Sequence, residues 1–173
     1  MLAKTGAEYD GGGQNSLSGT PQFSIIEAWL KENFFQKAFP KSADRYDFDV
    51  LGGINTLSAE DGAATLSAFT AMAIGKSVAD MGAVPDTVIV CGGGRHNKAM
   101  LWMLAEHVSA VVKTAEDMGW DGDAIEAQAF AYLAVRSKLG LPISFPATTG
   151  VPKPMTGGRV AYPSIRRGSR AGT

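Results

Sequence analysis

The chain has 173 residues and a formal net charge of −1, with 45% hydrophobic and 19% charged residues and one cysteine. Near-neutral charge excludes the basic footprint of a nucleic-acid-binding protein, and no apolar run approaches the roughly 20 residues of a membrane span, so we expect neither partner. A single thiol excludes a disulfide framework and, since no signal peptide is visible, predicts a cytoplasmic protein built on one domain.

The N-terminal part is predicted to be a loop followed by a helix. Residues 5–20 are rich in glycine, serine and asparagine, so the chain is expected to begin with a loop-rich stretch over 1–20. Thr20 followed by Pro21 is typical of an N-cap and a first helical position. Large residues then recur at helical spacing and predict the buried stripe of this helix: Ile25, Ile26, Trp29, Leu30 and Phe34.

Residues 35–57 are predicted to form an irregular loop, a kind of segment that is more often functional than decorative. Lys41 and Arg45 lie in it and carry positive charge that would suit a carboxylate or a phosphate of a ligand. The alternative is that both are solvated surface charges without a specific partner. The sequence leaves this choice open.

A long helix is predicted next, from Ser58 to about Met81. Ser58 and Asp61 resemble a capping box in which aspartate replaces the usual glutamate. Gly82 and Pro85 provide the signals that end the helix. Its predicted buried side is made by Leu66, Phe69, Thr70, Ala73 and Ile74.

Three consecutive glycines after a short apolar run are the strongest functional signal. Thr87–Cys91 is rich in β-branched residues and predicts a fully buried parallel strand, which would make Cys91 a packed, inert thiol. Gly92–Gly94 lack a Cβ, so a ligand can approach the backbone closely, and Asn97 stands where the next helix would have its N-cap. The arrangement favours a nucleotide, because free N–H groups and the helix dipole face an anion there.

Other observations limit this interpretation. The dinucleotide-binding fingerprint requires a third glycine where Asn97 stands, and no Gly-x-x-x-x-Gly-Lys-Ser/Thr phosphate loop is present. No acidic residue ends a second strand about 20 residues later, as recognition of a ribose would need. A glycine turn that only redirects the chain therefore stays open beside nucleotide binding.

The second half of the chain is predicted to alternate helices with a strand. Periodicity and end signals predict a helix over 98–108, a strand over 110–114 and a helix over 124–139. Together with the strand before the glycines, this order predicts an α/β fold with parallel pairing. Residues 141–163 hold five prolines and are expected as a wrapped tail, and 164–173 as a mobile basic end.

Glu126 is the most informative carboxylate, because it lies in a small and apolar helix segment where a charge needs a partner or a polar ligand. The alternative is an exposed and solvated helix glutamate. His96 and His107 occur without a cluster of carboxylates or thiols, so no metal site is expected.

Several segments carry a family resemblance: Val90–Asn97, Gly122–Ala131, Gly140–Val151, Pro154–Gly158, Tyr9-Asp10 and Pro40–Ser42. Together they resemble the anhydro-N-acetylmuramic acid kinase family. The resemblance covers most of residues 1–163, and several motifs in combination are more specific than the glycine turn alone.

The resemblance implies that residues 1–163 form the C-terminal lobe of an actin-like ATPase or sugar-kinase fold, which is ribonuclease H-like. The family's enzymes use ATP and Mg²⁺ to open the 1,6-anhydro ring of anhydro-N-acetylmuramate with water and to phosphorylate O6. The product, N-acetylmuramate 6-phosphate, belongs to cell-wall recycling. The family's Gly-Thr-Ser phosphate motif and general-base aspartate have no counterpart in this sequence. The resemblance therefore implies no catalytic residue here, a missing N-terminal lobe, and no activity for the chain alone.

The resemblance also implies binding roles. The nucleotide would lie against Gly92, Gly93, Gly94 and Asn97, and the sugar with its lactyl carboxylate would meet Glu126, Lys41 and Arg45. The alternative from another class is a non-catalytic nucleotide-binding or protein-interaction module that retains the fold. The open cleft face of such a module would be an exposed apolar patch, which favours self-association as a homodimer.

Overall fold

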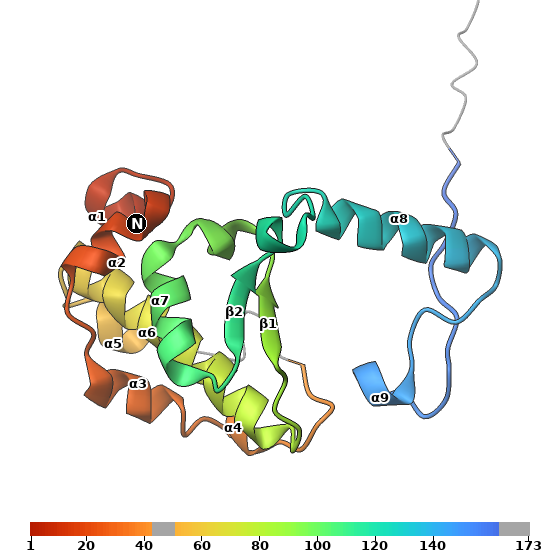
Figure 1. The fold of residues 1–173 in the computed structure, drawn as a ribbon, viewed down its shortest axis with the longest axis horizontal. Coiled ribbons are helices and arrows are strands. Elements are labelled where there is room, and N and C mark those ends of the chain that lie inside the picture. Colours follow the sequence, from red (N-terminus) through yellow and green to blue (C-terminus); the bar gives the residue numbers. More distant parts are fainter. Residues whose placement is uncertain (43–50, 163–173) are drawn as a thin grey trace, which may run out of the picture.

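The computed structural model of this protein describes residues 1–42 and 51–162, and they form a mixed α/β structure with a small parallel sheet (Figure 1). In chain order the elements, with η marking 3₁₀ helices, are α1 (Leu2–Thr5), η1 (Gly11–Gly13), α2 (Gln14–Ser18), α3 (Phe23–Trp29), α4 (Asn33–Gln36), α5 (Leu51–Ile54), α6 (Ala59–Asp80), β1 (Thr87–Val90), η2 (Gly93–His96), α7 (Lys98–His107), β2 (Val111–Thr114), η3 (Glu116–Met118), α8 (Ile125–Lys138) and α9 (Pro146–Thr149). The elements up to η3 form a helical body, and α8 extends away from it (Figure 1).

The long helix α6 is the centre of the body, and its predicted start is confirmed. The Ser58 hydroxyl accepts a hydrogen bond from the Asp61 N–H at 3.0 Å, as an N-cap should. The capping box is only half made, because the Asp61 carboxylate accepts the Thr20 N–H at 2.8 Å instead. This cross-link fastens the segment before α3 to the first turn of α6.

The predicted buried side of α6 is confirmed for Phe69, which is buried, and for Leu66, Ala73 and Ile74, which pack against the core, but not for Thr70. Thr70 is exposed, while the fully or nearly fully buried positions include the small residues Ala64, Ala68, Ala71 and Gly75. Small residues let α7 approach closely, and a Cβ at Gly75 would lie 2.4 Å from the His107 carbonyl oxygen. The prediction weighted large side chains, whereas the packing here is decided by how near the two helices come.

The hydrophobic core lies between α3, α4, α6 and α7. Trp29 and Phe69 meet edge to face with ring centroids 5.1 Å apart, and Phe35 lies 6.2 Å from Phe69. The buried members of this core are Ile26, Trp29, Phe35, Ile54, Ala68, Phe69, Ala71, Met103, Leu104 and Val108. Ile26 and Trp29 therefore confirm the centre of the predicted N-terminal stripe.

Two predictions for the N-terminal part are wrong. Residues 5–20 contain η1 and α2 as well as loop, and α3 begins at Phe23 with Gln22 as its N-cap. Thr20 does not cap α3, because its N–H bonds to Asp61, and the Gln22 N–H bonds to the Thr65 hydroxyl at 3.0 Å. Contacts with α6 thus delay the helix start by two residues.

The two strands pair in parallel, as predicted, with Val88 opposite Val112. Each residue of β1 is half-buried rather than fully buried. Within the described ranges the sheet has two strands, so β1 is an edge strand and is not flanked by strands on both sides. Cys91 is exposed, not packed, since the chain leaves the sheet after Val90. Both corrections have the same cause, which is how small the sheet is.

The predicted helix over 124–139 is confirmed as α8, but none of its residues is buried. The following segment folds back along it, because the Arg136 Nε donates to the Pro142 carbonyl at 2.7 Å and the Ser137 hydroxyl bonds to the Gly157 carbonyl. Residues 164–173 and Arg45 lie outside the described residues. Within residues 1–42 and 51–162, no helix has both the length and the apolar character needed to cross a bilayer.

Candidate functional site

The glycine turn connects β1 to α7 and leaves part of its backbone open. Gly92 has a φ of +68°, which favours glycine, and a Cβ placed at Gly92 or Gly93 would meet nothing within 4 Å. Gly94 differs, because a Cβ there would lie 2.9 Å from the Met100 Cε. The open approach to the backbone is therefore at Gly92 and Gly93.

Asn97 caps α7, as predicted from the sequence. Its Oδ1 accepts the Met100 N–H at 3.0 Å, and its Nδ2 donates to the Ser67 hydroxyl at 3.4 Å. Gly13 has a φ of +74° and packs directly on this side chain, since a Cβ there would lie 2.2 Å from Oδ1. The start of α7 is thus held by both η1 and α6.

One face of the turn borders a hollow of about 470 Å³ that we call the α8-side hollow. Its lining residues are Cys91, Gly92, Gly93, Gly122, Asp123, Ile125 and Glu126. Glu126 lies in the first turn of α8, is exposed, and makes no hydrogen bond or ion pair with any described residue. The structure therefore brings the predicted glycine turn and the predicted sugar-binding carboxylate to the same hollow.

The other face borders a second hollow of about 470 Å³, the η1-side hollow, lined by Tyr9, Asp10, Gly12, Gly93, Gly94, His96 and Asn97. Asp10 accepts hydrogen bonds from the Ser16 hydroxyl at 2.7 Å and from the Asn15 N–H at 2.9 Å. Burial by itself raises the pKa of the Asp10 carboxyl, but the hydrogen bonds from Ser16 and Asn15 outweigh it and hold that pKa below its ordinary value.

Asp10 is also linked to the turn through side chains. The Ser16 hydroxyl is 2.9 Å from the Ser67 hydroxyl, which accepts from Asn97. Ser16 and Ser67 are both buried, so each hydroxyl needs the partner that the other provides. This chain of contacts fixes the η1-side hollow to the cap of α7.

Arg95 is the residue of this site that the sequence analysis missed. Only 6% of it is exposed, and its guanidinium bonds to the Glu116 carboxylate, the Asp123 carboxylate and the Gly92 carbonyl at 2.8, 2.8 and 2.9 Å. The hydrogen bond from Arg95 holds the pKa of Glu116 below its ordinary value. Its carboxylate partners lie 21 and 28 residues away in sequence, so helical or strand periodicity carries no signal of the cluster.

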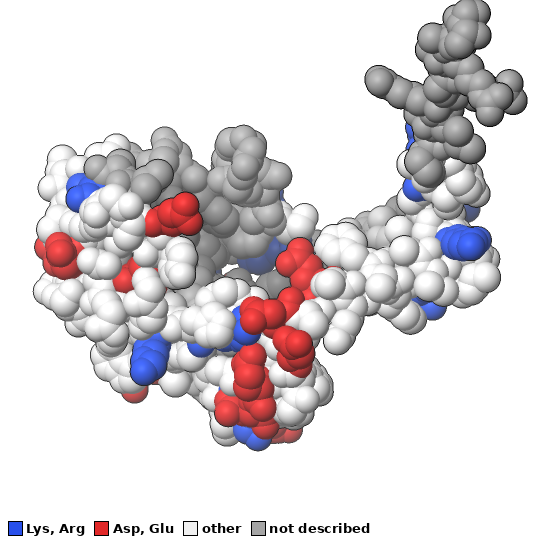
Figure 2. All heavy atoms as spheres, turned by 90° about the horizontal axis from the view of Figure 1, so that it is seen from above, with Lys and Arg blue, Asp and Glu red and all other residues white. Residues whose placement is uncertain are grey.

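Acidic residues gather around this cluster. Figure 2 shows Asp and Glu side chains concentrated where the body meets α8. The exposed acidic residues between β2 and the first turn of α8 are Glu116, Asp117, Asp121, Asp123 and Glu126. The Thr114 N–H and hydroxyl both bond to Asp117 and hold the pKa of that carboxyl below its ordinary value. The described part of the chain has no group of three residues placed to hold a metal ion.

Lys41 lines neither hollow. Its Nζ is buried, has no hydrogen-bond partner among the described residues, and lies 4.8 and 4.9 Å from the ring centroids of Phe39 and Phe34. The structure therefore places Lys41 over aromatic rings rather than beside Glu126. Its role toward a ligand stays a prediction, as does that of Arg45.

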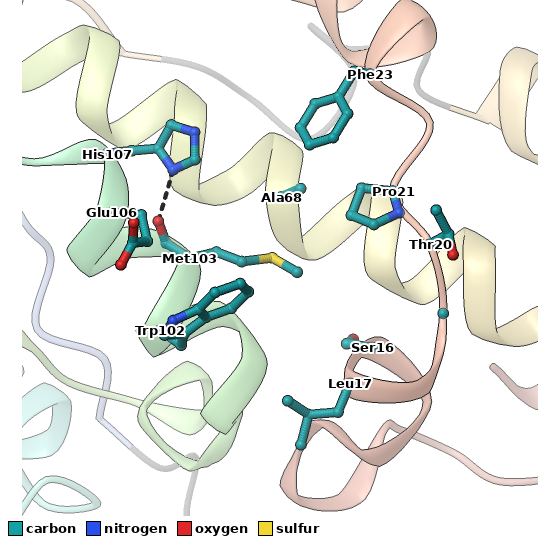
Figure 3. A pocket seen from close by; sticks show the side chains of 11 residues that line it. Ser16, Leu17, Thr20, Pro21, Phe23, Ala68, Trp102, Met103, Glu106 and His107 are labelled. Carbon is teal, nitrogen blue, oxygen red and sulfur yellow. Dashed lines mark hydrogen bonds between the residues drawn. The ribbon is translucent and has the colours of Figure 1, made fainter.

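A third hollow, of about 340 Å³, is mostly apolar and lies between α2, the start of α3, α6 and α7. Figure 3 shows Phe23, Met103 and Trp102 directed toward it, with the His107 ring bonded to the Met103 carbonyl at 2.7 Å. Trp102 is 61% exposed at its edge. None of the predicted site residues lines this hollow.

Comparison with known proteins gives a consistent result. Residues 1–163 match the family described as anhydro-N-acetylmuramic acid kinase. A relative of that name from Caulobacter vibrioides is 54% identical over 161 residues, which are 92% of this chain and 43% of the relative. Relatives of the same name from Phenylobacterium zucineum and Zymomonas mobilis subsp. mobilis are 51% and 48% identical, over 94% of this chain and 44% of each relative. The chain thus spans less than half the length of these relatives.

Proposed function

The chain belongs to the anhydro-N-acetylmuramic acid kinase family, and from that membership we propose that it forms one side of a sugar-kinase cleft. In this proposal the α8-side hollow takes the phosphates of ATP against Gly92 and Gly93, and Glu126 bonds to hydroxyl groups of the sugar. The observation that carries the proposal is that these three residues line a single hollow.

The glycine turn fits a nucleotide on physical grounds. Phosphate oxygens need to come close to backbone N–H groups, and the space where a Cβ would stand at Gly92 or Gly93 is open. The turn leads into α7, a helix of 10 residues whose N-terminus carries a partial positive charge. Asn97 at this N-terminus lines the η1-side hollow, which shares Gly93 with the α8-side hollow. Asn97 would keep that first turn ordered rather than bind the phosphate, because its Oδ1 accepts from Met100 and its Nδ2, the group that could donate to a phosphate, donates to Ser67.

Mg²⁺ would arrive with the nucleotide, because this ion is usually held by substrate phosphates and one or two carboxylates. Glu126 supplies a carboxylate at the edge of the same hollow, whereas the carboxylate of Asp123 is paired with Arg95. The ion would supply positive charge that offsets the negative charge developing during phosphoryl transfer. The carboxylate of Glu126 makes no hydrogen bond or ion pair with the described residues, so it is free to meet a sugar hydroxyl.

The reaction proposed for the whole protein consumes ATP and one water. Water opens the 1,6-anhydro ring of anhydro-N-acetylmuramate, and the γ-phosphoryl group passes to O6, which leaves ADP and N-acetylmuramate 6-phosphate. We assign no catalytic residue to this chain, and propose that the general base belongs to the part of the relatives that it does not span. The chain alone is then inactive, and we propose the cytoplasm as its location.

A partner that covers α8 is part of the proposal. The apolar side chains of Tyr132 and Val135 in α8 and of Leu139 at its C-cap are exposed and share one face by their helical spacing. Contiguous apolar surface of this kind marks an interface. We propose that an N-terminal lobe of the actin-like ATPase type covers it, and that residues 1–163 form the C-terminal lobe.

The same exposed face favours the second candidate function, an interaction module that binds a further copy of itself. Sedimentation velocity of the chain over a hundredfold concentration range separates the two. A dimer that ignores ATP favours the module, whereas a monomer that responds to ATP favours the kinase lobe.

Cys91 makes nucleotide binding directly measurable. It is the one cysteine of the chain, is exposed, and lines the α8-side hollow, so its reaction with N-ethylmaleimide reports on access to that hollow. We expect Mg-ATP to slow the reaction and NAD to leave it unchanged. Gly93→Val, which fills the open approach, should abolish the protection. Equal rates with and without Mg-ATP would contradict the proposal.

Activity is tested by mass-spectrometric detection of N-acetylmuramate 6-phosphate from Mg-ATP and the anhydro sugar. The Caulobacter vibrioides relative, run in parallel, is the positive control because it is longer and carries the family name. Product from the relative alone supports the division of roles proposed here. Product from this chain would show that the base lies within its 173 residues.

A further inference from the structure

We propose that Arg95 is a positioning residue, which holds the glycine turn and the start of α8 at the spacing that puts Gly92, Gly93 and Glu126 on one hollow. The nucleotide and sugar in this role come from the proposed function, on which the inference rests. The arrangement itself stands on contacts within the chain.

Arg95 joins three separate pieces of the chain. Its Nη1 donates to the carbonyl of Gly92 at the start of the turn, its Nε to Glu116 in η3, and its Nη2 to Asp123 just before α8. The side chain is 4% exposed, whereas the carboxylate-bearing side chains are 51% and 80% exposed. A buried guanidinium needs such partners, so the loop before α8 is held where Arg95 requires it.

Gly122 shows how closely this loop fits the arginine. A Cβ at Gly122 would lie 2.4 Å from the Arg95 Nε and 2.7 Å from the Glu116 Oε1. The buried glycine therefore lets the backbone pass over the guanidinium, with Asp123 in reach of Nη2. Glu126 follows three residues after Asp123, so its place relative to the turn is set at the same contact.

Few other contacts among the described residues can hold α8 in place relative to the glycine turn. No residue of α8 is buried, so packing of the helix itself does not fix its direction from the body. Arg95–Asp123 is the one ion pair, among residues the structure describes, that joins the segment before α8 to the glycine turn. Arg95 is therefore the side chain whose ion pair ties the position of Glu126 to the glycine turn.

Arg95 is placed to position the site and not to bind phosphate. To reach an anion it would have to leave two carboxylates and the Gly92 carbonyl, leaving negative charge beside the same hollow. Lysine cannot replace it, because its donors share one nitrogen, whereas the guanidinium reaches Glu116, Asp123 and the Gly92 carbonyl from three separate nitrogens. Arg95→Lys thus keeps the charge and removes the geometry.

The test compares Arg95→Lys with Arg136→Lys in the 173-residue chain. Arg136 is a matched control, because it also bonds a loop carbonyl, that of Pro142, but its hydrogen-bond partners line neither hollow, whereas Arg95 bonds Gly92 and Asp123, which line the α8-side hollow. Two quantities are measured: amide hydrogen exchange without ligand, and the Mg-ATP concentration that half-protects Cys91 from N-ethylmaleimide. Asp123→Asn is a second variant at an exposed position, so the test survives if Arg95→Lys does not fold.

We expect Arg95→Lys to speed exchange about tenfold in residues 92–97 and 121–127 together, and to raise the half-protecting concentration about tenfold, as loss of a charge-assisted hydrogen bond would. Arg136→Lys should change neither the exchange rate nor the half-protecting concentration. Asp123→Asn should change both in the same direction as Arg95→Lys. For Arg95→Ala, added methylguanidinium should restore the protection, because it refills the gap between the carboxylates.

The outcomes separate the inference from the proposed function. If Arg95→Lys leaves amide exchange unchanged in both segments, the role of Arg95 is overturned. The same holds if the substitution speeds exchange evenly along the whole chain and leaves Mg-ATP protection of Cys91 unchanged. Faster exchange in both segments together with no Mg-ATP protection of the unsubstituted chain supports the positioning role and refutes nucleotide binding.

Discussion

The contact between α6 and α7 predicts opposite effects for two substitutions on one helix. Gly62 and Gly75 both lie inside α6, where alanine is favoured over glycine by about 1 kcal/mol. A Cβ at Gly62 meets nothing within 4 Å, so Gly62→Ala should raise the free energy of unfolding by about 1 kcal/mol. At Gly75 the same Cβ would lie 2.4 Å from the His107 carbonyl oxygen and 3.1 Å from its carbon.

Gly75→Ala should therefore lower the free energy of unfolding. The helices must separate to admit the methyl group, and overpacking of this kind costs up to about 3 kcal/mol when backbone has to move. Subtracting the gain in helix propensity leaves a loss of about 2 kcal/mol. Urea denaturation followed by tryptophan fluorescence measures both variants, because buried Trp29 contacts Phe69 in the core. Equal stabilisation by both substitutions would refute the close approach of α6 and α7.

Three further predictions concern the site. Gly93→Ala should leave the unfolding midpoint unchanged, since its Cβ meets nothing, yet weaken Mg-ATP protection of Cys91 about tenfold by occupying the approach to the backbone. Asn97→Ala should cost about 1 kcal/mol of unfolding free energy, the usual value of an N-cap, measured with urea. The pKa of Asp10 is lower in the folded protein than in the unfolded chain, where it is about 4. The ionised carboxylate therefore stabilises the fold fully above about pH 4, and this stabilisation is lost as the pH falls through the folded pKa. The difference in free energy of unfolding between the wild type and Asp10→Asn should shrink below about pH 4.

Local signals in the sequence predicted the elements that position the site. Ser58 and Asn97 both cap the helices that were assigned to them, because a cap depends on residues only three positions apart. The parallel pair of strands also follows from the order of strand, helix and strand. Glu126 was singled out as a carboxylate in an apolar segment, and its sugar-binding role came from the family resemblance, but its place beside the glycine turn was not predicted.

Features decided by contacts distant in sequence were not predicted. The start of α3 depends on Asp61, which takes the Thr20 N–H, and the buried face of α6 depends on how close α7 lies. The exposure of Cys91 depends on the width of the sheet. Arg95 was missed for the same reason, because its acidic partners are far along the chain.

The bare surface of α8 has a consequence for how the protein comes apart. A helix of 14 residues without buried side chains gains little from packing, and isolated helices of this length are marginal in water. Unfolding should then occur in two steps, with α8 melting before the body, and limited trypsin digestion should cut first at Lys138. A polypeptide that binds along this helix would merge the two unfolding transitions into one and protect Lys138 from trypsin. The number of unfolding transitions therefore reports whether α8 has a bound partner.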